Sequence, residues 1–314
     1  MAAPAKVNLT LRLLGLREDG YHEVETVLQA LALHDELVVR PAPAGISLEV
    51  DFPPEGHAAG FDVPTGPENL VCRAARKFIS EAAIETGVEF FLRKRIPPGA
   101  GLGGGSSDAA AALLLLDELF DRPLDRQALM RLAGGLGADV PFFLEAGRQL
   151  GKGIGDQLTP LVEEQPLHFL LILPPFGCST AAVYEKQRAR LTAISPSHKV
   201  LEVKGGSHKG LEIPEGLVND LESVAMELHP ELEQLVARVR AAGCPDVRMS
   251  GSGSALFVAS TSEARIREAE MRLAWVCDEG VATLCTSSDR REPVAKGPCS
   301  VAWPGKDRSE EGQQ

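Results

Sequence analysis

A run of glycine, serine and acidic residues between positions 97 and 108 has the composition of a phosphate-binding loop. It reads Pro-Pro-Gly-Ala-Gly-Leu-Gly-Gly-Gly-Ser-Ser-Asp, and the alanine- and leucine-rich segment after it predicts a helix from Ser107 to about Phe120. Glycines let backbone N–H groups turn toward one point, and a helix N-terminus adds unpaired N–H donors and a positive dipole end. We therefore expect this segment to hold phosphate groups.

Two other interpretations of the glycine run fit the sequence less well, and a Walker A motif is absent elsewhere. A flexible linker has polar flanks, whereas an apolar strand over 88–92 precedes this run. A dinucleotide-binding fingerprint, which residues 99–104 formally match, needs a βαβ unit, but a second helix over 125–133 follows in place of a strand. The segment 151–153 lacks the Ser or Thr and the spacing of a Walker A motif. A phosphate-binding loop of another type remains.

Lys6 and Asp139 are the candidate charged groups for phosphoryl transfer, which needs charge neutralisation and a group that deprotonates the attacking hydroxyl. Apolar residues alternate with Lys6 and Asn8, which predicts a half-buried strand with both polar side chains on one face. Asp139 ends a glycine-rich turn over 134–139 and precedes a Val-Pro pair, which favours an extended backbone. Taken singly, each has an ordinary interpretation, the lysine as solvated surface and the aspartate as a turn or cap residue.

Two further segments carry candidate binding groups. Tyr21 and His22 follow a turn built on Asp19-Gly20, and their planar rings suit stacking on a base and hydrogen bonding to it; the alternative is that they cap a strand turn. The second small-residue loop, Ser250-Gly251-Ser252-Gly253, lies between two predicted strands. It is either a simple hairpin connection or a second contact to phosphate.

Composition excludes several classes of protein. The chain has 314 residues, 44% of them hydrophobic, and a formal net charge of −12, which argues against a nucleic-acid partner. No apolar run approaches the ~20 residues that span a bilayer, and Met1–Lys6 leads into a strand without a signal-peptide core. The 6 cysteines show no C-x-x-C pairing. We expect a cytoplasmic protein with reduced thiols and no membrane partner.

The periodicity predicts an α+β protein of two domains. Strands are expected at 36–40, 46–52, 88–93, 168–173, 247–250, 254–259 and 281–286, with helices at 69–86, 218–228, 231–242 and 262–276. Residues 148–166, rich in Gly and Pro, predict a connection. We expect an N-terminal domain with the glycine loop over 1–160, a C-terminal α+β domain over 161–287 and a flexible tail over 288–314.

The motifs occur together and in a definite order. They are Pro4-Ala-Lys6-Val-Asn8-Leu, Asp19-Gly-Tyr-His22, Pro97 to Asp108, Gly137-Ala-Asp139-Val-Pro141 and Ser250-Gly-Ser-Gly253. With this set, over about residues 2–286, the chain resembles the 4-diphosphocytidyl-2-C-methyl-D-erythritol kinases of the galactokinase, homoserine kinase, mevalonate kinase and phosphomevalonate kinase superfamily. The glycine loop points to the superfamily, and the Lys-Asn start with the Tyr-His turn points to this branch.

The resemblance implies a two-domain small-molecule kinase fold with the active site in the cleft between the domains. It implies an ATP- and Mg²⁺-dependent transferase that phosphorylates the C2 hydroxyl of 4-diphosphocytidyl-2-C-methyl-D-erythritol, in the non-mevalonate biosynthesis of isoprene and terpenoid precursors. Asp139 would be the general base, and Lys6 beside it would keep that carboxylate ionised and offset developing negative charge. No residue is assigned as a direct metal ligand.

The resemblance also assigns binding residues. The ATP phosphates would lie against Pro97, Pro98, Gly99, Ala100, Gly101, Leu102, Gly103, Gly104, Gly105, Ser106 and Ser107, with one of the two serines near the β-phosphate or Mg²⁺. The cytidine-diphosphate substrate would contact Asn8, Tyr21, His22, Thr180 and Tyr184.

Two alternatives stay open at this point. One is a homoserine- or mevalonate-type kinase, whose acceptor carries no nucleotide. The other is a non-catalytic nucleotide-binding relative, which would be expected to lose Lys6, Asp139 or the glycine loop; all three are present. The oligomeric state is also open, with a homodimer among the possibilities.

Overall fold

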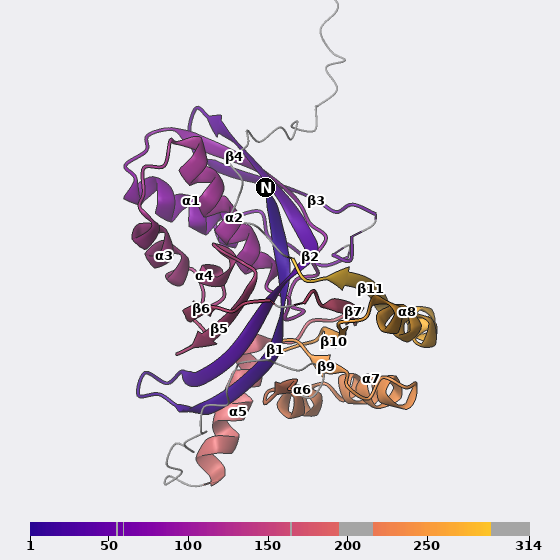
Figure 1. Cartoon of the computed structure of the whole chain (residues 1–314). Coiled ribbons are helices and arrows are strands. Elements are labelled where there is room, and N and C mark those ends of the chain that lie inside the picture. The colour runs from indigo at the N-terminus through magenta and orange to yellow at the C-terminus, as the bar shows by residue number, and fades with distance from the viewer. Residues whose placement is uncertain (55, 59, 164, 195–215, 290–314) are drawn as a thin grey trace, which may run out of the picture.

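Two β-sheets, each with helices on one face, make up the chain (Figure 1). The computed structural model describes residues 1–314 except positions 55, 59, 164, 195–215 and 290–314. Strands β1 (Ala2–Leu16) and β2 (His22–Ala42) of the first sheet and β7 (His168–Leu173) and β10 (Leu256–Ser260) of the second contribute to one buried hydrophobic cluster. The expected α+β architecture with two units is confirmed.

The first sheet places β1 in its interior. Its other strands are β3 (Ile46–Asp51), β4 (Gly87–Arg93), β5 (Arg148–Lys152), β6 (Gln157–Pro160) and β8 (Val218–Asn219). The strand order is β3-β4-β2-β1-β8, and β5 pairs with both β2 and β6. Strand β8 pairs with β1 at Thr10 and Leu11, so the middle of β1 has a neighbouring strand on both sides.

Both faces of β1 are buried, where the sequence predicted one polar, solvated face. Val7 and Leu9 are 0% and 1% exposed, and the intervening Lys6, Asn8 and Thr10 are only 3%, 4% and 8% exposed. The prediction that Lys6 and Asn8 share a face is right, but that face is covered by the glycine loop and by the loop over residues 250–253. The alternative of a solvated surface lysine is therefore wrong.

Four helices pack on the face of the first sheet that is turned away from the second sheet (Figure 1). They are α1 (Leu70–Glu81), α2 (Gly104–Leu119), α3 (Arg126–Gly134) and α4 (Val140–Phe143). Helix α2 begins three residues earlier than predicted, because Gly103 adopts φ 70° as its N-cap and Gly104 and Gly105 form its first turn. Its alanines at 109–112 are all buried, and such small side chains let α2 approach the sheet and α1 closely.

The extended backbone predicted before Pro141 is also wrong. Asp139 has φ −82° and ψ −15°, and α4 begins at Val140 directly after it. Pro141 lies in the first turn of that helix, where no carbonyl needs its missing N–H and its fixed φ is already helical.

The segment predicted as a connection, 148–166, contains the β5–β6 hairpin instead. Gly153 and Gly155 have φ of 72° and 99° and make the turn, and Gly151 faces the backbone of that turn, where a Cβ would lie 2.9 Å from the Gly155 carbonyl oxygen. The glycines therefore serve a tight turn rather than a loose linker. The hairpin adds to β2 through pairs such as Leu28 with Gln149.

The second sheet has the order β11-β7-β10-β9, with β9 (Arg248–Met249) and β11 (Ala282–Ser287) in addition to β7 and β10. Strand β7 has the predicted bounds. The predicted helix over 218–228 begins with β8 and becomes α6 (Glu222–Leu228), while α7 (Pro230–Ala241) is close to its prediction. The predicted helix over 262–276 ends earlier, as α8 (Glu263–Arg272), and a 3₁₀ helix (Ala274–Glu279) follows. Helix α5 (Thr180–Ile194) precedes the undescribed segment 195–215.

The division of the chain near residue 160 stays a prediction. The chain passes from the first sheet to the second between β6 and β7, but β8 returns to pair with β1. Ser288 and Asp289, the first residues of the predicted tail, donate backbone hydrogen bonds to Leu167 and Ala30 at 2.8 and 2.9 Å. Residues 290–314 lie outside the described part of the chain.

A buried charge cluster ties α2 to the first sheet. The Lys94 Nζ, just beyond β4, lies 2.5 Å from the Asp35 carboxylate on β2 and 2.7 Å from the Asp108 carboxylate on α2. The other Asp35 oxygen accepts from the backbone N–H groups of Arg95 and Ile96. One ammonium therefore faces two carboxylates. Burial and the Asp35 charge raise the pKa of Asp108 to about 8, against the opposing effect of Lys94.

We predict that this cluster makes stability depend on pH. The folded-state pKa of Asp108, about 8, lies above the usual aspartate pKa of 3.8, so the folded protein binds the additional proton. Its contribution is therefore complete at low pH and is lost as the pH rises from about 4 toward 8, by at most about 1.4 kcal/mol per pH unit. Asp108→Asn removes this titration. Urea unfolding at pH 5, 6.5 and 8 should show the variant gaining stability relative to wild type as the pH rises.

The comparison of the two proteins cancels the titrating groups that do not interact with Asp108. A variant that instead loses stability relative to wild type with rising pH would mean that Asp108 is ionised in the folded state and forms an ordinary ion pair with Lys94.

Candidate functional site

The Lys6 ammonium is held in place by a chain of polar groups on β1 and β2. Its Nζ donates to Oδ1 of Asn8 at 2.7 Å and lies 3.5 Å from Oδ2 of Asp139. The Asn8 side-chain nitrogen donates to the Thr26 hydroxyl at 2.8 Å, and that hydroxyl donates to the Thr10 carbonyl at 2.6 Å. The Lys6 side chain is 4% exposed and that of Asp139 37% exposed. The carboxylate is therefore accessible to a second molecule, whereas the cation is fixed behind it.

The glycine loop packs directly on this cluster. The Lys6 backbone N–H donates to the Leu102 carbonyl at 2.9 Å, which joins β1 to the loop. Gly99, Gly101 and Gly103 have φ of 67°, 77° and 70°, a region that L-amino acids with a side chain rarely adopt. A Cβ on Gly103 would lie 2.8 Å from the Phe143 ring and 3.0 Å from Cγ of Lys6. The loop therefore reaches its position only with glycines.

The first turn of α2 provides the donors expected of a phosphate site. The N–H groups of Gly104, Gly105 and Ser106 open the helix, and no carbonyl of the preceding turn exists to accept them. The Ser107 N–H is the first to bond within the helix, to the Gly103 carbonyl at 2.9 Å. The Ser107 hydroxyl is buried without a hydrogen-bond partner. This combination fits anionic oxygens, and the hydroxyl fits a hard cation accompanying them.

The loop over residues 250–253 connects β9 to β10 and closes the cluster from the second sheet. The Ser250 hydroxyl accepts from the Asn8 N–H at 3.4 Å and donates to the Gly101 carbonyl at 2.9 Å. Gly251 lies so close that a Cβ there would be 3.2 Å from Oδ1 of Asn8 and 3.3 Å from Nζ of Lys6. The loop is thus a hairpin connection in form, and its contacts are with the Lys6 cluster and the glycine loop.

Hydroxyl and aromatic groups line the neighbouring region. The Thr180 and Ser252 hydroxyls lie 2.7 Å apart. His22 is 5% exposed, its Nε2 is buried without a partner, and its ring centroid lies 5.4 Å from that of Tyr184. Burial and the nearby Arg188 charge lower the pKa of His22. Burial and the Asp139 charge raise the pKa of Tyr184 to about 12, which places its ring near the carboxylate.

The structure brings most of the predicted site residues together, and one stands apart. Lys6, Asn8, Asp139, the glycine loop and the loop 250–253 form one cluster, with Thr180 joined to it through Ser252 and Tyr184 joined to His22. The Tyr21 side chain is 62% exposed, because adjacent residues at the start of β2 point in opposite directions. Its role stays a prediction.

Three contributing residues were missed by the sequence analysis. Thr26 holds Asn8, Phe143 lies under Gly103, and Arg188 lies near His22. Arg188 follows Tyr184 by four positions on α5, so helical spacing was an available signal. Thr26 had none, because its position depends on the register of β1 on β2, which shifts between Asn8 and Thr10.

Two further properties of the described residues concern metal binding and membranes. Among these residues no group of three or more His, Cys, Asp or Glu side chains could hold a metal ion. No helix in the described part of the chain is long and apolar enough to cross a membrane.

Comparisons with known proteins agree on one family. The family models described as GHMP kinases N terminal domain and GHMP kinases C terminal match residues 69–147 and 204–275. A 4-diphosphocytidyl-2-C-methyl-D-erythritol kinase from Syntrophus aciditrophicus is 41% identical over 268 residues, 85% of this chain and 92% of the relative. One from Pelotomaculum thermopropionicum is 42% identical over 261 residues, 81% and 86% of the two chains.

A solved structure gives the same result. The crystal structure of 4-(cytidine 5'-diphospho)-2C-methyl-D-erythritol kinase is similar to this chain with a TM-score of 0.69 and 37% sequence identity. The match covers 92% of this chain and 99% of that chain.

We predict that the glycine loop tolerates a methyl group at Gly105 but not at Gly103. Gly103→Ala requires an unfavourable positive φ and displaces Phe143 or Lys6, whereas a Cβ on Gly105 meets only Leu70 Cδ1 at 3.6 Å. The strain of about 1–2 kcal/mol should weaken binding of a non-hydrolysable ATP analogue about tenfold in Gly103→Ala. Calorimetric titration of both variants measures this difference. Equal affinities in the two variants would place the phosphates elsewhere.

Proposed function

Since the chain belongs to the family of 4-diphosphocytidyl-2-C-methyl-D-erythritol kinases, we propose that it transfers the γ-phosphate of ATP to the C2 hydroxyl of 4-diphosphocytidyl-2-C-methyl-D-erythritol. The step belongs to the non-mevalonate biosynthesis of isoprene and terpenoid precursors. The observation that carries the proposal is the contact between Lys6 and Asp139 beside the glycine loop. That geometry unites a cation, a carboxylate and a phosphate-binding loop, which are the parts needed for phosphoryl transfer to an alcohol.

In this proposal Asp139 is the general base. A carboxylate is a weak base toward an alcohol, so it accepts the proton only as the bond from oxygen to phosphorus forms. The Lys6 ammonium, 3.5 Å from Oδ2 of Asp139, offsets negative charge on the transferring group. Asn8 and Thr26 hold the ammonium in place, so little reorganisation is needed during the reaction.

The donor side is assigned to residues 97–107. The N–H groups at the start of α2 bind the ATP phosphates, and the glycines at 99, 101 and 103 allow the backbone to approach them. The unpartnered Ser107 hydroxyl, or that of Ser106, lies on the side where Mg²⁺ would accompany the phosphates. When bound, Mg²⁺ neutralises charge on the phosphate oxygens.

The acceptor side is assigned to His22, Tyr184, Thr180 and Asn8, with Tyr21 in the same turn. Because its pKa is lowered, the His22 imidazole is neutral at pH 7 and offers one donor and one acceptor nitrogen. Its buried Nε2 has no protein partner, which fits the polar edge of a cytosine base. The Tyr184 ring forms an adjacent apolar wall. The Thr180 and Ser252 hydroxyls are suited to the diphosphate.

The remaining alternative is a homoserine- or mevalonate-type acceptor on the same fold, and acceptor specificity separates it from this proposal. We also propose that the enzyme acts in the cytoplasm, which is supported by the absence of disulfides among the five described cysteines, all of them free thiols. A homodimer is retained as a hypothesis for measurement.

We predict that Asp139→Asn abolishes turnover but preserves nucleotide binding. Loss of a general base costs 10²–10⁴-fold, about 3–5 kcal/mol of barrier. Single-turnover rates at saturating ATP and acceptor, with a parallel titration of an ATP analogue, separate the two effects. Lys6→Met keeps the aliphatic contacts beside Gly103 and should also lose turnover without a large change in melting temperature. Near-normal rates in the Asn variant would remove Asp139 from the mechanism.

We predict that the acceptor must contain cytidine. A site built to hydrogen-bond a base edge rejects analogues that lack it by about 10⁴-fold, roughly 5 kcal/mol. ATP-consumption assays should show negligible activity on methylerythritol phosphate, homoserine and mevalonate. His22→Ala should raise KM for the cytidine substrate far more than KM for ATP, whereas His34→Ala, at another histidine of β2, should change neither. Efficient phosphorylation of an acceptor without cytidine would overturn the substrate assignment.

A further inference from the structure

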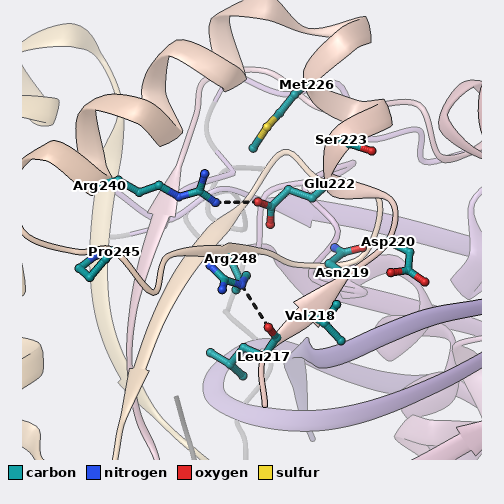
Figure 2. Close-up of a pocket in the computed structure, with 10 residues that line it drawn as sticks. All are labelled: Leu217, Val218, Asn219, Asp220, Glu222, Ser223, Met226, Arg240, Pro245 and Arg248. Carbon is teal, nitrogen blue, oxygen red and sulfur yellow. Dashed lines mark hydrogen bonds and ion pairs between the residues drawn. The ribbon is translucent and has the colours of Figure 1, made fainter. Parts of the chain in front are cut away.

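A short polar segment lies behind the loop 250–253, on the side away from Lys6. Residues 219–222 read Asn-Asp-Leu-Glu and connect β8 to α6. Asn219, Asp220 and Glu222 line a pocket of about 600 Å³ together with Arg240 and Arg248 (Figure 2). Apolar side chains such as Met226 and Pro245 also line it.

The charged side chains of this pocket are each engaged by the protein. Glu222 pairs with Arg240 at 2.9 Å, and Arg248 donates to the Leu217 carbonyl at 3.2 Å (Figure 2). The Asp220 carboxylate accepts from the Leu13 N–H at 2.8 Å, which attaches the segment to β1. The polar lining is therefore accounted for by internal contacts, and those contacts point toward the site.

Asn219 and Glu222 hold the backbone that leads into the loop. The Asn219 side-chain nitrogen donates to the carbonyls of Met249 and Gly251, both at 2.8 Å, and its oxygen accepts from the Leu221 N–H at 3.0 Å. Glu222 accepts from the Met249 N–H at 3.2 Å. Asn219 is 8% exposed, and all of its hydrogen-bonding groups face protein. The N–H and carbonyl of Met249 and the carbonyl of Gly251 are thus held in place by Asn219 and Glu222.

Two residues of this stretch, Ser250 and Gly251, contact the Lys6 cluster on the opposite side. Gly251 abuts the Lys6 ammonium and the Asn8 amide oxygen, and Ser250 bonds to both the Asn8 N–H and the Gly101 carbonyl. A shift of the Gly251 carbonyl toward solvent would therefore move Gly251 away from the Lys6 ammonium. Because displacements of about 1 Å in an active site can cost about 100-fold in rate, the position of Gly251 has to be fixed.

We propose that Asn219, supported by Glu222, is a positioning residue for the phosphoryl-transfer site and acts through the loop 250–253 on Lys6 and the glycine loop. The kinetic part of this inference rests on the proposed function, but the structural part does not. It requires no ligand in the pocket of Figure 2.

The test compares Asn219→Asp with Ser223→Ala. The aspartate keeps the acceptor for the Leu221 N–H but replaces the donor to the two carbonyls with an oxygen, whereas Ser223 lines the same pocket and bonds only to Arg190 among the described contacts. We expect Asn219→Asp to lower kcat about 10- to 100-fold, with KM for the cytidine acceptor within about threefold of wild type. Ser223→Ala should match wild type.

Hydrogen–deuterium exchange provides a readout that needs no activity. Amides of residues 249–254 should exchange at least about tenfold faster in Asn219→Asp and remain protected in Ser223→Ala. If Asn219→Asp fails to fold, Glu222→Gln should show the same changes in smaller degree, because its single amide oxygen cannot accept from both the Met249 N–H and Arg240. Unchanged exchange and unchanged kcat in a folded variant would overturn the inference. A wild type inactive on every acceptor would instead refute the proposed function and leave the exchange result intact.

Discussion

One buried hydroxyl joins the three chain segments on which the site depends. Ser250 accepts from the Asn8 N–H of β1 and donates to the Gly101 carbonyl of the glycine loop, while the Lys6 N–H bonds to Leu102 of that loop. The approach is so close that a Cβ on Gly101 would lie 2.2 Å from the Ser250 carbonyl oxygen. Ser250 lies 149 and 242 positions from its two partners, so segments distant in sequence fix one another, and the position of Lys6 relative to Asp139 follows from their mutual packing.

Two buried lysines near α2 have different surroundings, and their charges therefore have different roles. Lys94 faces two carboxylates that are at most 5% exposed, so its charge is neutralised within the protein and it stabilises the attachment of α2. Lys6 faces one carboxylate, and that carboxylate is 37% exposed and accessible to an acceptor. In a chain with a net charge of −12, positive potential for an anionic donor thus comes from Lys6 and the α2 N-terminus rather than from the surface as a whole.

Local patterns were sufficient to predict the parts of the site that depend on local geometry. The alternation at residues 6–9 places Lys6 and Asn8 on one face, the glycine spacing locates the loop, and the bounds of β7 agree with its apolar run. Predictions that depended on distant packing were wrong or missing. The hairpin within residues 148–166 depends on pairing with β2. The burial of Lys6 depends on a loop 244 residues away, and the role of Asn219 depends on its contacts with residues 249 and 251. No short-range pattern carries those contacts.

In the proposed function, the groups assigned to the donor and those assigned to the acceptor come from different elements. Residues 97–107 and α2 belong to the first sheet and its helices, whereas Thr180 and Tyr184 come from α5, and His22 comes from the start of β2. Lys6 lies against Gly103 of the donor group, and the charge of its partner Asp139 adds to burial in raising the pKa of Tyr184 in the acceptor group. Changes in α5 or in the β1–β2 turn can therefore alter which alcohol is accepted while the phosphate loop and the reactive pair stay in place. Such a division explains physically how one fold can phosphorylate different acceptors with one donor site.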